Sequence, residues 1–224
     1  MDALFDQMQE KKKPLAPFIV YLILFNGAWV CWVLFIYPRM RELGEASLSY
    51  ALLNIALRLA IWVVPVLAYL RYVDHTDPVT YLKLSCAWRR GLQIGIGLTL
   101  LNLLLSVARF GVPHPNWHAV TWNNVLSTSL LIGFIEEIPF RGFILQKLGE
   151  RMNFASATAL SSGLFLAIHL PGWISLHMLN PGVAVFVFVF GVAMAIIFKY
   201  SNSLWSVIVA HSLNDFLSVV VFKR

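Results

Sequence analysis

The sequence contains few charged residues. Asp, Glu, Lys and Arg together make up 12% of its 224 residues, which is about half of the ~25% share found in a typical soluble protein. Hydrophobic residues make up 59%, so the chain is not an intrinsically disordered protein, a class defined by low hydrophobicity. Cysteine is also scarce: Cys31 and Cys86 are the two present. They form no metal-binding or redox pattern, and a disulfide-rich scaffold is excluded.

The basic residues do not form a nucleic-acid-binding surface. The formal net charge is +6, but the Lys and Arg residues are scattered between apolar runs and no basic face builds up. We therefore expect no nucleic acid among the partners of this protein.

Long apolar runs are abundant, and they predict a membrane protein. Crossing a ~30 Å hydrocarbon layer takes about 20 apolar residues, and backbone groups in lipid must be hydrogen-bonded within helices. We predict an all-α, polytopic transmembrane helix bundle with about seven spans, at 17–37, 48–73, 91–110, 122–149, 154–170, 181–199 and 203–222. A short segment at 173–179 is expected to be an interfacial or re-entrant turn. If it crosses the membrane, the number of spans is eight.

The chain is predicted to consist of a cytoplasmic N-terminal tail, residues 1–16, and a single transmembrane domain, residues 17–224. Acidic residues precede the lysines of the tail and no small-residue cleavage site precedes the first span, which favours a retained tail over a signal peptide. More Lys and Arg residues fall on the inner side when the N-terminus is placed inside. We therefore predict a multi-pass protein of the plasma or inner membrane with a cytoplasmic N-terminus.

Several ionisable residues lie inside the predicted spans. Each such group at mid-bilayer costs at least ~2.5–3.5 kcal/mol on insertion scales. We therefore expect most of them to face one another or a wet cavity. They are Arg58, Glu136, Glu137, Arg141, His169, His211 and Asp215.

The spacing within the fourth predicted span separates its two acids. Glu137 and Arg141 are four residues apart on one face of a helix, which predicts a local ion pair with a structural role. Glu136 is rotated by about 100° from Glu137, so it is expected to remain free for chemistry. Pro139 lacks a backbone N–H and is expected to kink the helix beside the acids. Arg58, on another span, is expected to pair or to snorkel, without a catalytic role.

Two further spans carry polar residues at helical spacing. Phe165 and His169 share one face of the fifth span. His211 and Asp215 share one face of the last span, and Asn214 lies one position off that face. Three helices are thus expected to bring polar groups toward one interior point.

A carboxylate and an imidazole around a buried water form a general-base pair. Glu136 is expected to take the proton of that water while His169 orients it, so that hydroxide attacks a peptide carbonyl. The resulting oxyanion needs hydrogen-bond donors. His211, together with Asp215 or Asn214, is placed to supply them.

A zinc site is the rival interpretation of the same residues. Glu136, His169, His211 and Asp215 are competent ligands for a catalytic zinc ion with an open water position. The H-E-x-x-H pattern of intramembrane zinc proteases is absent from the sequence. We therefore favour water activation by glutamate without a metal cofactor and keep zinc as the alternative.

Three motifs carry a resemblance to a known family. The segments 136–141, 165–169 and 211–215 resemble the E-E-x-x-x-R, F-x-x-x-H and H-x-x-x-N/D motifs of the CAAX protease and bacteriocin-processing family. This family, also called Abi, includes type II CAAX prenyl endopeptidases. The resemblance implies an all-helical intramembrane glutamate endopeptidase. In it, Glu136 and His169 activate water, His211 and Asp215 form the oxyanion site, and Glu137, Arg141, Phe165 and Asn214 support them.

The last motif departs from the eukaryotic CAAX endopeptidases, which have Asn where this sequence has Asp215. An aspartate donates a hydrogen bond to an oxyanion only when it is protonated, and deep burial is expected to favour that form. Asn214 can take its place only if the helix rotates locally.

The sequence therefore predicts an intramembrane peptidase. Its expected partners are the lipid bilayer and a membrane-anchored, lipidated or otherwise hydrophobic peptide or protein as substrate. One alternative is a non-proteolytic bacteriocin-immunity or scaffold protein that keeps the polar centre for helix packing. A transporter, in which intramembrane acids relay protons, is a weaker alternative because no inverted repeat is visible.

Overall fold

The structure is a computed structural model that describes residues 14–112 and 117–221. Within these ranges every regular element is helical and no strand occurs. This confirms the predicted all-α class. Most of the predicted N-terminal tail, residues 1–13, lies outside the described residues.

The N-terminal half contains two long, nearly continuous helical arms and a third long helix. The first arm is followed by a short loop, and the second is followed by a one-turn helix, α6 (Pro78–Tyr81). The first arm consists of α2 (Ala16–Cys31), the π-helix η1 (Trp32–Ile36) and α3 (Tyr37–Arg41). The second consists of α4 (Leu48–Trp62), α5 (Val64–Ala68) and the π-helix η2 (Tyr69–Val73), and the third long helix is α7 (Trp88–Phe110).

The C-terminal half begins with a long arm that changes winding several times. This arm consists of η4 (Asn123–Leu130), α8 (Ile132–Glu137), η5 (Ile138–Ile144) and α9 (Leu145–Gly149), preceded by the short η3 (Trp117–Ala119). The remaining elements are α10 (Phe154–Ala167), α11 (Leu170–Ser175), α12 (Pro181–Ser201), α13 (Leu204–Phe216) and η6 (Leu217–Val221).

Five helical stretches of the described chain are long and apolar enough to cross a membrane, and they correspond to five of the predicted spans. They are Ala16–Arg41, Leu48–Val73, Trp88–Arg109, Phe154–Ser175 and Pro181–Ser201. The predicted spans 122–149 and 203–222 are also helical over their described residues. The first of them carries the charged motif, and the second contains the shorter apolar helix Leu204–Val219. The chain is thus a multi-pass membrane protein, and five spans are supported by length and hydropathy.

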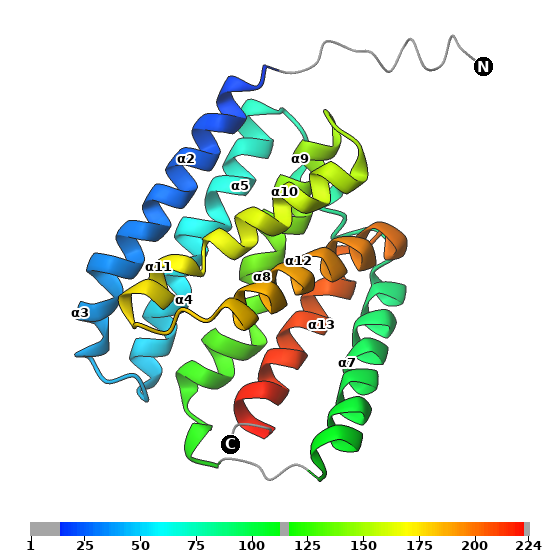
Figure 1. Cartoon of the computed structure of the whole chain (residues 1–224). Helices are drawn as coiled ribbons and strands as arrows, with labels where there is room; N and C mark the ends of the chain where they lie inside the picture. Colours follow the sequence, from blue (N-terminus) through cyan, green and yellow to red (C-terminus); the bar gives the residue numbers. More distant parts are fainter. Residues whose placement is uncertain (1–13, 113–116, 222–224) are drawn as a thin grey trace.

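The segment 173–179 does not form a separate long helix. Its first residues belong to α11, which continues the Phe154–Ser175 stretch beyond a turn at 168–169, and its remainder is the loop before α12. In Figure 1 α11 lies at the end of the bundle near α3.

The arm from η4 to α9 runs through the interior of the bundle (Figure 1). Between Ile135 and Leu145 each side chain is buried, and a helix buried on every side belongs at the centre of a domain. Aromatic rings of the surrounding helices pack on it, with Phe25 and Trp62 against Phe140 at centroid distances of 6.0 and 5.9 Å. The acidic motif therefore sits on the most enclosed helix of the bundle.

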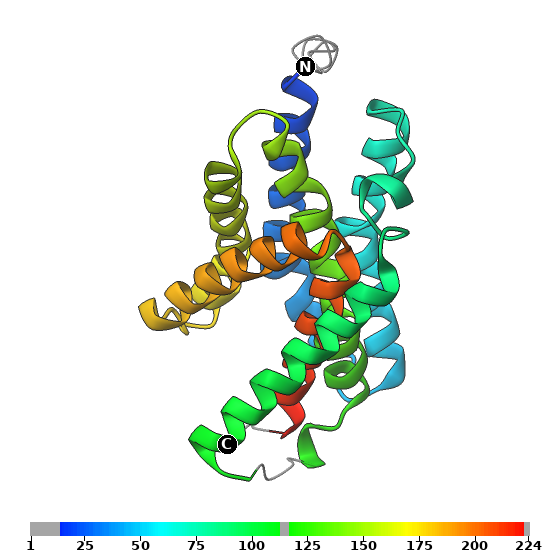
Figure 2. The same cartoon turned by 90° about the vertical axis from the view of Figure 1, so that its right-hand side faces the viewer.

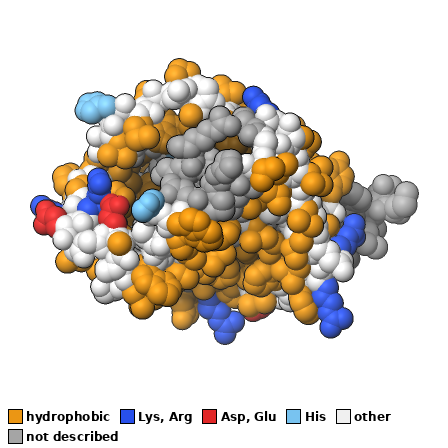
Figure 3. Space-filling model, turned by 90° about the horizontal axis from the view of Figure 1, so that it is seen from below, with side chains coloured by type: hydrophobic (Ala, Val, Ile, Leu, Met, Phe, Trp, Pro, Cys, Tyr) orange, Lys and Arg blue, Asp and Glu red, His pale blue; other side chains and the backbone are white. Residues whose placement is uncertain are grey.

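Many large hydrophobic side chains are exposed on the outside of the bundle, and Figure 3 shows them gathered on the face seen from below. They include Ile23 on α2, Leu104 on α7 and Phe186 on α12, each at least 65% exposed. Figure 2 shows α7 and α12 diverging from each other on one side of the molecule. Such apolar exposure fits an environment of lipid rather than water.

Two glycines let α13 approach its neighbours closely. A Cβ atom on Gly133 of α8 would lie 2.4 Å from the carbonyl oxygen of Ile208 in α13. A Cβ atom on Gly95 of α7 would lie 2.7 Å from the Cβ of Val209. Small residues at a crossing permit this contact between membrane helices, and here the contact fixes the position of His211, one turn further along α13.

Candidate active site

The ion pair predicted between Glu137 and Arg141 is confirmed. Arg141 Nη1 donates to Glu137 Oε1 at 3.0 Å, and both side chains are fully buried. Arg141 Nη2 also donates to the carbonyl oxygen of Gly191 in α12 at 3.2 Å, and its guanidinium lies 4.4 Å from the ring centroid of Phe165 in α10. This one side chain therefore joins the central arm to α10 and α12.

Glu137 also orients His211. The Nδ1 atom of His211 lies 2.6 Å from Glu137 Oε1, the oxygen that already accepts from Arg141. Because a carboxylate in this position accepts, the Nδ1 atom of His211 is the donor. The Nε2 atom of His211 is thereby turned toward two other carboxylates, at 3.9 Å from Glu136 Oε2 and 3.7 Å from Asp215 Oδ2.

The prediction that Glu136 remains free is wrong. Arg58 Nη2 of α4 donates to Glu136 Oε1 at 3.1 Å, and both residues are buried. The predicted pairing of Arg58 is thus confirmed, and its partner is the expected catalytic acid. The second oxygen, Oε2, faces His211 Nε2 at a distance too long for a direct hydrogen bond.

His169 follows Phe165 by four residues. Its Nδ1 atom is 2.8 Å from the carbonyl oxygen of Phe165, and since a carbonyl oxygen can only accept, Nδ1 is the donor and Nε2 carries the lone pair. The Phe165 ring contacts both imidazoles, with centroid distances of 5.0 Å to His169 and 6.2 Å to His211. Among the described residues, no ion pair or hydrogen bond links His169 to Glu136, so the histidine nearest to that acid is His211 rather than His169.

The structure distinguishes the two candidates for the last motif position. The side chain of Asp215 is 38% exposed and approaches His211. Asn214 instead faces α7, where Asn102 Nδ2 donates to its Oδ1 at 2.9 Å. Of the two residues, Asp215 is thus the one that lies beside His211, and it is half-buried rather than deeply buried as expected.

A comparison with protein families finds a match over the part of the chain that carries these residues. Residues 117–217 match the family model described as "Type II CAAX prenyl endopeptidase Rce1-like". The matched segment contains all three motifs. Residues 117–217 form an Rce1-like domain. No curated protein and no solved structure matches the chain.

The Rce1-like domain changes its helical winding beside the two acids. The α-helical hydrogen bonding of α8 ends at Glu137, and π-helical winding begins at Ile138. Pro139 explains the change, because it has no N–H to donate to the preceding turn. This altered winding lies where the kink was predicted, and π segments are frequent at functional sites.

Each of the two adjacent glutamates of the Rce1-like domain is paired with an arginine. One oxygen of Glu136 accepts from Arg58 and one oxygen of Glu137 accepts from Arg141. Over residues 14–112 and 117–221, no group of three or more His, Cys, Asp or Glu side chains is arranged to hold a metal ion.

Two contacts of the Rce1-like domain could not be predicted from the sequence. The first is the ion pair of Arg58 with Glu136. The sequence signal for it is a cation within an apolar helix, which indicates that a buried partner is needed. The second is Phe190 of α12, whose ring lies 4.9 Å from that of His211. No motif or spacing marks Phe190 among the many phenylalanines of the sequence.

Proposed function

We propose that this protein is an intramembrane endopeptidase that hydrolyses a peptide bond in a membrane-associated or lipidated substrate with water activated by Glu136, without a metal. The supporting observation is the geometry of one carboxylate. Its Oε1 atom is fixed by Arg58, while its Oε2 atom faces the His211 Nε2 atom at 3.9 Å. The family match at residues 117–217 supports the protease class.

In the proposed reaction, Glu136 Oε2 accepts a proton from the water as the oxygen attacks the substrate carbonyl. We assign His169 to orient this water, because its Nδ1 proton is used by the Phe165 carbonyl and its Nε2 atom is an acceptor. In the described part of the chain, no hydrogen bond or ion pair joins His169 to Glu136. Catalytic hydrogen bonds often shorten only in the complex with substrate.

The tetrahedral intermediate carries a negative oxygen that needs donors. His211 in its imidazolium form donates from Nε2, because Glu137 has fixed Nδ1 as the other donor. Asp215, next to Nε2 at 3.7 Å, contributes a donor when it is protonated. The intermediate then collapses as the proton held by Glu136 passes to the leaving amine, which regenerates the carboxylate.

Two features favour a mechanism without metal. Both glutamates already accept from a guanidinium group, and these fixed cations oppose the binding of a dication at the same oxygens by charge repulsion. The arginine contacts also hold the carboxylates in the acceptor state that a general base requires.

We further propose that the protein resides in the plasma or inner membrane with its N-terminus in the cytoplasm. The excess of Lys and Arg on the inner side of the predicted topology supports this orientation. The substrate is then a peptide or protein anchored in the same bilayer.

A scaffold or immunity function is the second candidate, and one observation favours it. Glu136 and Glu137 are both paired with arginines from the helix bundle, so the polar centre is also explained by helix packing. Under this hypothesis the amide of a glutamine at residue 136 leaves the biological function intact.

Mass spectrometry of membrane peptides separates the two candidates. Cells with wild-type protein are compared with cells carrying Glu136→Gln, in which the Gln carbonyl can still accept from Arg58. We expect an intact substrate to accumulate and its cleavage product to disappear in this variant. Glu42→Gln is the matched control, because Glu42 is exposed at the end of α3. Identical peptide repertoires in wild type and Glu136→Gln would refute the proposed function.

A further inference from the structure

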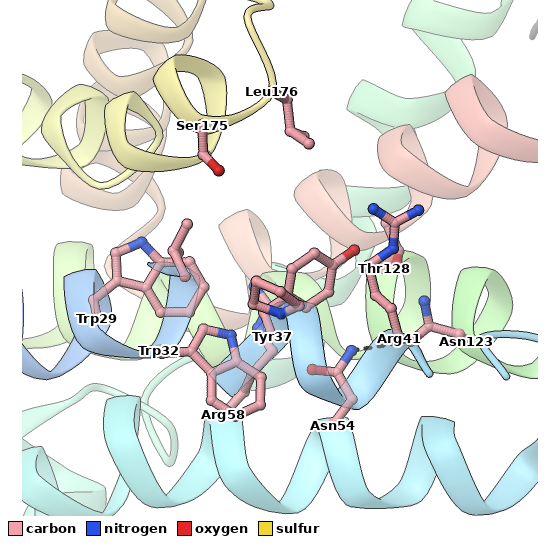
Figure 4. Close-up of a pocket in the computed structure, with 13 residues that line it drawn as sticks. Trp29, Trp32, Tyr37, Arg41, Asn54, Arg58, Asn123, Thr128, Ser175 and Leu176 are labelled. Carbon is pink, nitrogen blue, oxygen red and sulfur yellow. Dashed lines mark hydrogen bonds between the residues drawn. The ribbon is translucent and has the colours of Figure 1, made fainter. Parts of the chain in front are cut away.

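A cavity of about 370 Å³ lies next to the proposed active site (Figure 4). Its walls come from the first helical arm, α4, η4 and α11. Ser175 and Leu176 face the aromatic side chains of Trp29, Trp32 and Tyr37 across the open space (Figure 4). Its volume falls within the range of about 300–1,000 Å³ for ligand pockets.

The charges on the cavity wall have one sign. Arg41 and Arg58 line it, together with hydrogen-bonding side chains such as Asn54 and Ser175. No Asp or Glu is among the described lining residues. A partly apolar cavity with two guanidinium groups and no lining acid is suited to an anionic ligand, and guanidinium groups pair especially well with carboxylates.

Arg58 connects this cavity to the proposed active site. Its Nη2 atom donates to Glu136, while its buried Nε atom has no hydrogen-bond partner among the described residues. A ligand in the cavity can therefore contact the same arginine that holds the carboxylate we assign to catalysis.

Arg41 is available for exchange of partners. It lies at the end of α3 and pairs with Glu45, and both side chains are about half exposed. Exposed pairs of this kind contribute at most about 1 kcal/mol. A ligand carboxylate held in the cavity can therefore compete with Glu45 for the Arg41 guanidinium.

We propose that this cavity binds a carboxylate of the peptide substrate and that Arg41 is the residue that pairs with it. The assignment of the ligand as substrate rests on the proposed function. The carboxylate is either the C-terminus of the peptide or an acidic side chain. A peptide is favoured over a lipid headgroup because Arg58 links the cavity to Glu136 and because amide and hydroxyl side chains on the cavity wall are groups that hydrogen-bond to a peptide backbone.

Binding of synthetic peptides to the full-length protein tests the proposal without requiring cleavage. The protein is placed in phosphatidylcholine nanodiscs, and the dissociation constants of dye-labelled apolar pentapeptides are measured by fluorescence anisotropy. The three probes are a free-acid peptide, its C-terminal amide, and an amide peptide with one internal glutamate. We expect the free-acid or the glutamate peptide to bind about tenfold or more tightly than the plain amide, and the stronger of the two identifies the source of the carboxylate.

Variants of two neighbouring arginines and of Glu45 provide the controls. Arg41→Gln is expected to abolish the preference for a carboxylate. Glu45→Gln is expected to increase it about twofold, because the competing carboxylate is removed. Arg39→Gln is the matched control, since Arg39 is on the same helix, donates to the Phe35 carbonyl and does not line the cavity.

Three results would overturn the proposal. The first is equal affinity of all three peptides for the wild type, and the second is a carboxylate preference that survives in Arg41→Gln. The third is displacement of the peptide by phosphatidylglycerol that depends on Arg41, together with loss of the preference for a carboxylate peptide. That result would assign the cavity to a lipid. Since only binding is measured, Arg41-dependent binding together with unchanged peptide repertoires in Glu136→Gln would refute the proposed catalysis and leave the carboxylate site standing.

Discussion

Arg141→Gln is expected to destabilise the protein far more than Arg41→Gln, although each change removes the guanidinium of an i,i+4 ion pair. Glu137, the partner of Arg141, is fully buried, and its Oε2 atom already lacks a hydrogen-bond partner among the described residues. Without Arg141 the carboxylate keeps only His211. Breaking a buried pair from one side costs about 3–5 kcal/mol, whereas the exposed pair of Arg41 is worth about 0–1 kcal/mol.

Thermal unfolding of the purified protein in detergent measures this difference. For a chain of this size, 1 kcal/mol shifts the melting temperature by about 2–4 °C, so Arg141→Gln is expected to lower it by about 6–20 °C and Arg41→Gln by less than about 4 °C. Adding Glu137→Gln to Arg141→Gln should restore part of the loss, because no unpaired charge then remains buried. Equal shifts for the two single variants would show that Arg141 does not compensate a buried charge.

Three further predictions concern packing, the oxyanion site and metal. Gly133→Ala places a Cβ atom 2.4 Å from a backbone oxygen of α13, so it should destabilise the protein by about 1–3 kcal/mol. Gly163→Ala is the control, because no atom lies within 4 Å of its new Cβ. Equal melting temperatures of the two variants would contradict the prediction. Asp215→Asn should retain cleavage, because an amide donates a hydrogen bond without being protonated. Asp215→Ala should reduce the cleavage rate by about 10²–10³-fold. Equal losses of activity in the two variants would refute the role of residue 215 as a hydrogen-bond donor. Treatment with a chelator should leave the cleavage rate unchanged, and a loss of activity that zinc restores would establish the metalloprotease instead.

Hydropathy predicts helices well in this protein because it depends on neighbouring residues alone. The apolar stretches from Ala16 to Arg41 and from Pro181 to Ser201 appear as long helices close to their predicted bounds. The arm that holds Glu136 is different, because its charges lower its hydropathy while its helix is enclosed by protein. Hydropathy therefore identifies a membrane crossing least clearly at the helical arm that holds Glu136.

The candidate site shows the same distinction between local and distant contacts. The pair of Glu137 and Arg141 could be predicted because helical spacing alone brings these side chains together. The pair of Glu136 and Arg58 joins positions 78 residues apart, and its formation depends on how α4 and α8 pack. Helical rotation indicated that Glu136 would not share the partner of Glu137, but it could not show that Glu136 would pair with Arg58.

Asn214 is an example of a candidate residue whose contacts could not be predicted from its position in the sequence. Its position next to Asp215 made it a candidate for the oxyanion site. Its amide is instead engaged by Asn102, across the interface of α7 and α13. Such a contact depends on the close crossing of two helices, which no periodicity within either helix can reveal.

The cleavage rate of purified Glu136→Gln, relative to wild type, tests the central claim most directly. The substrate is the one identified from the membrane peptides, and the fold of the variant is verified by its melting temperature. A general base contributes about 10²–10⁴-fold to a rate, so kcat should fall by that factor while KM changes little. A Glu136→Gln protein that cleaves at the wild-type rate would contradict the assignment of this carboxylate as the group that activates water.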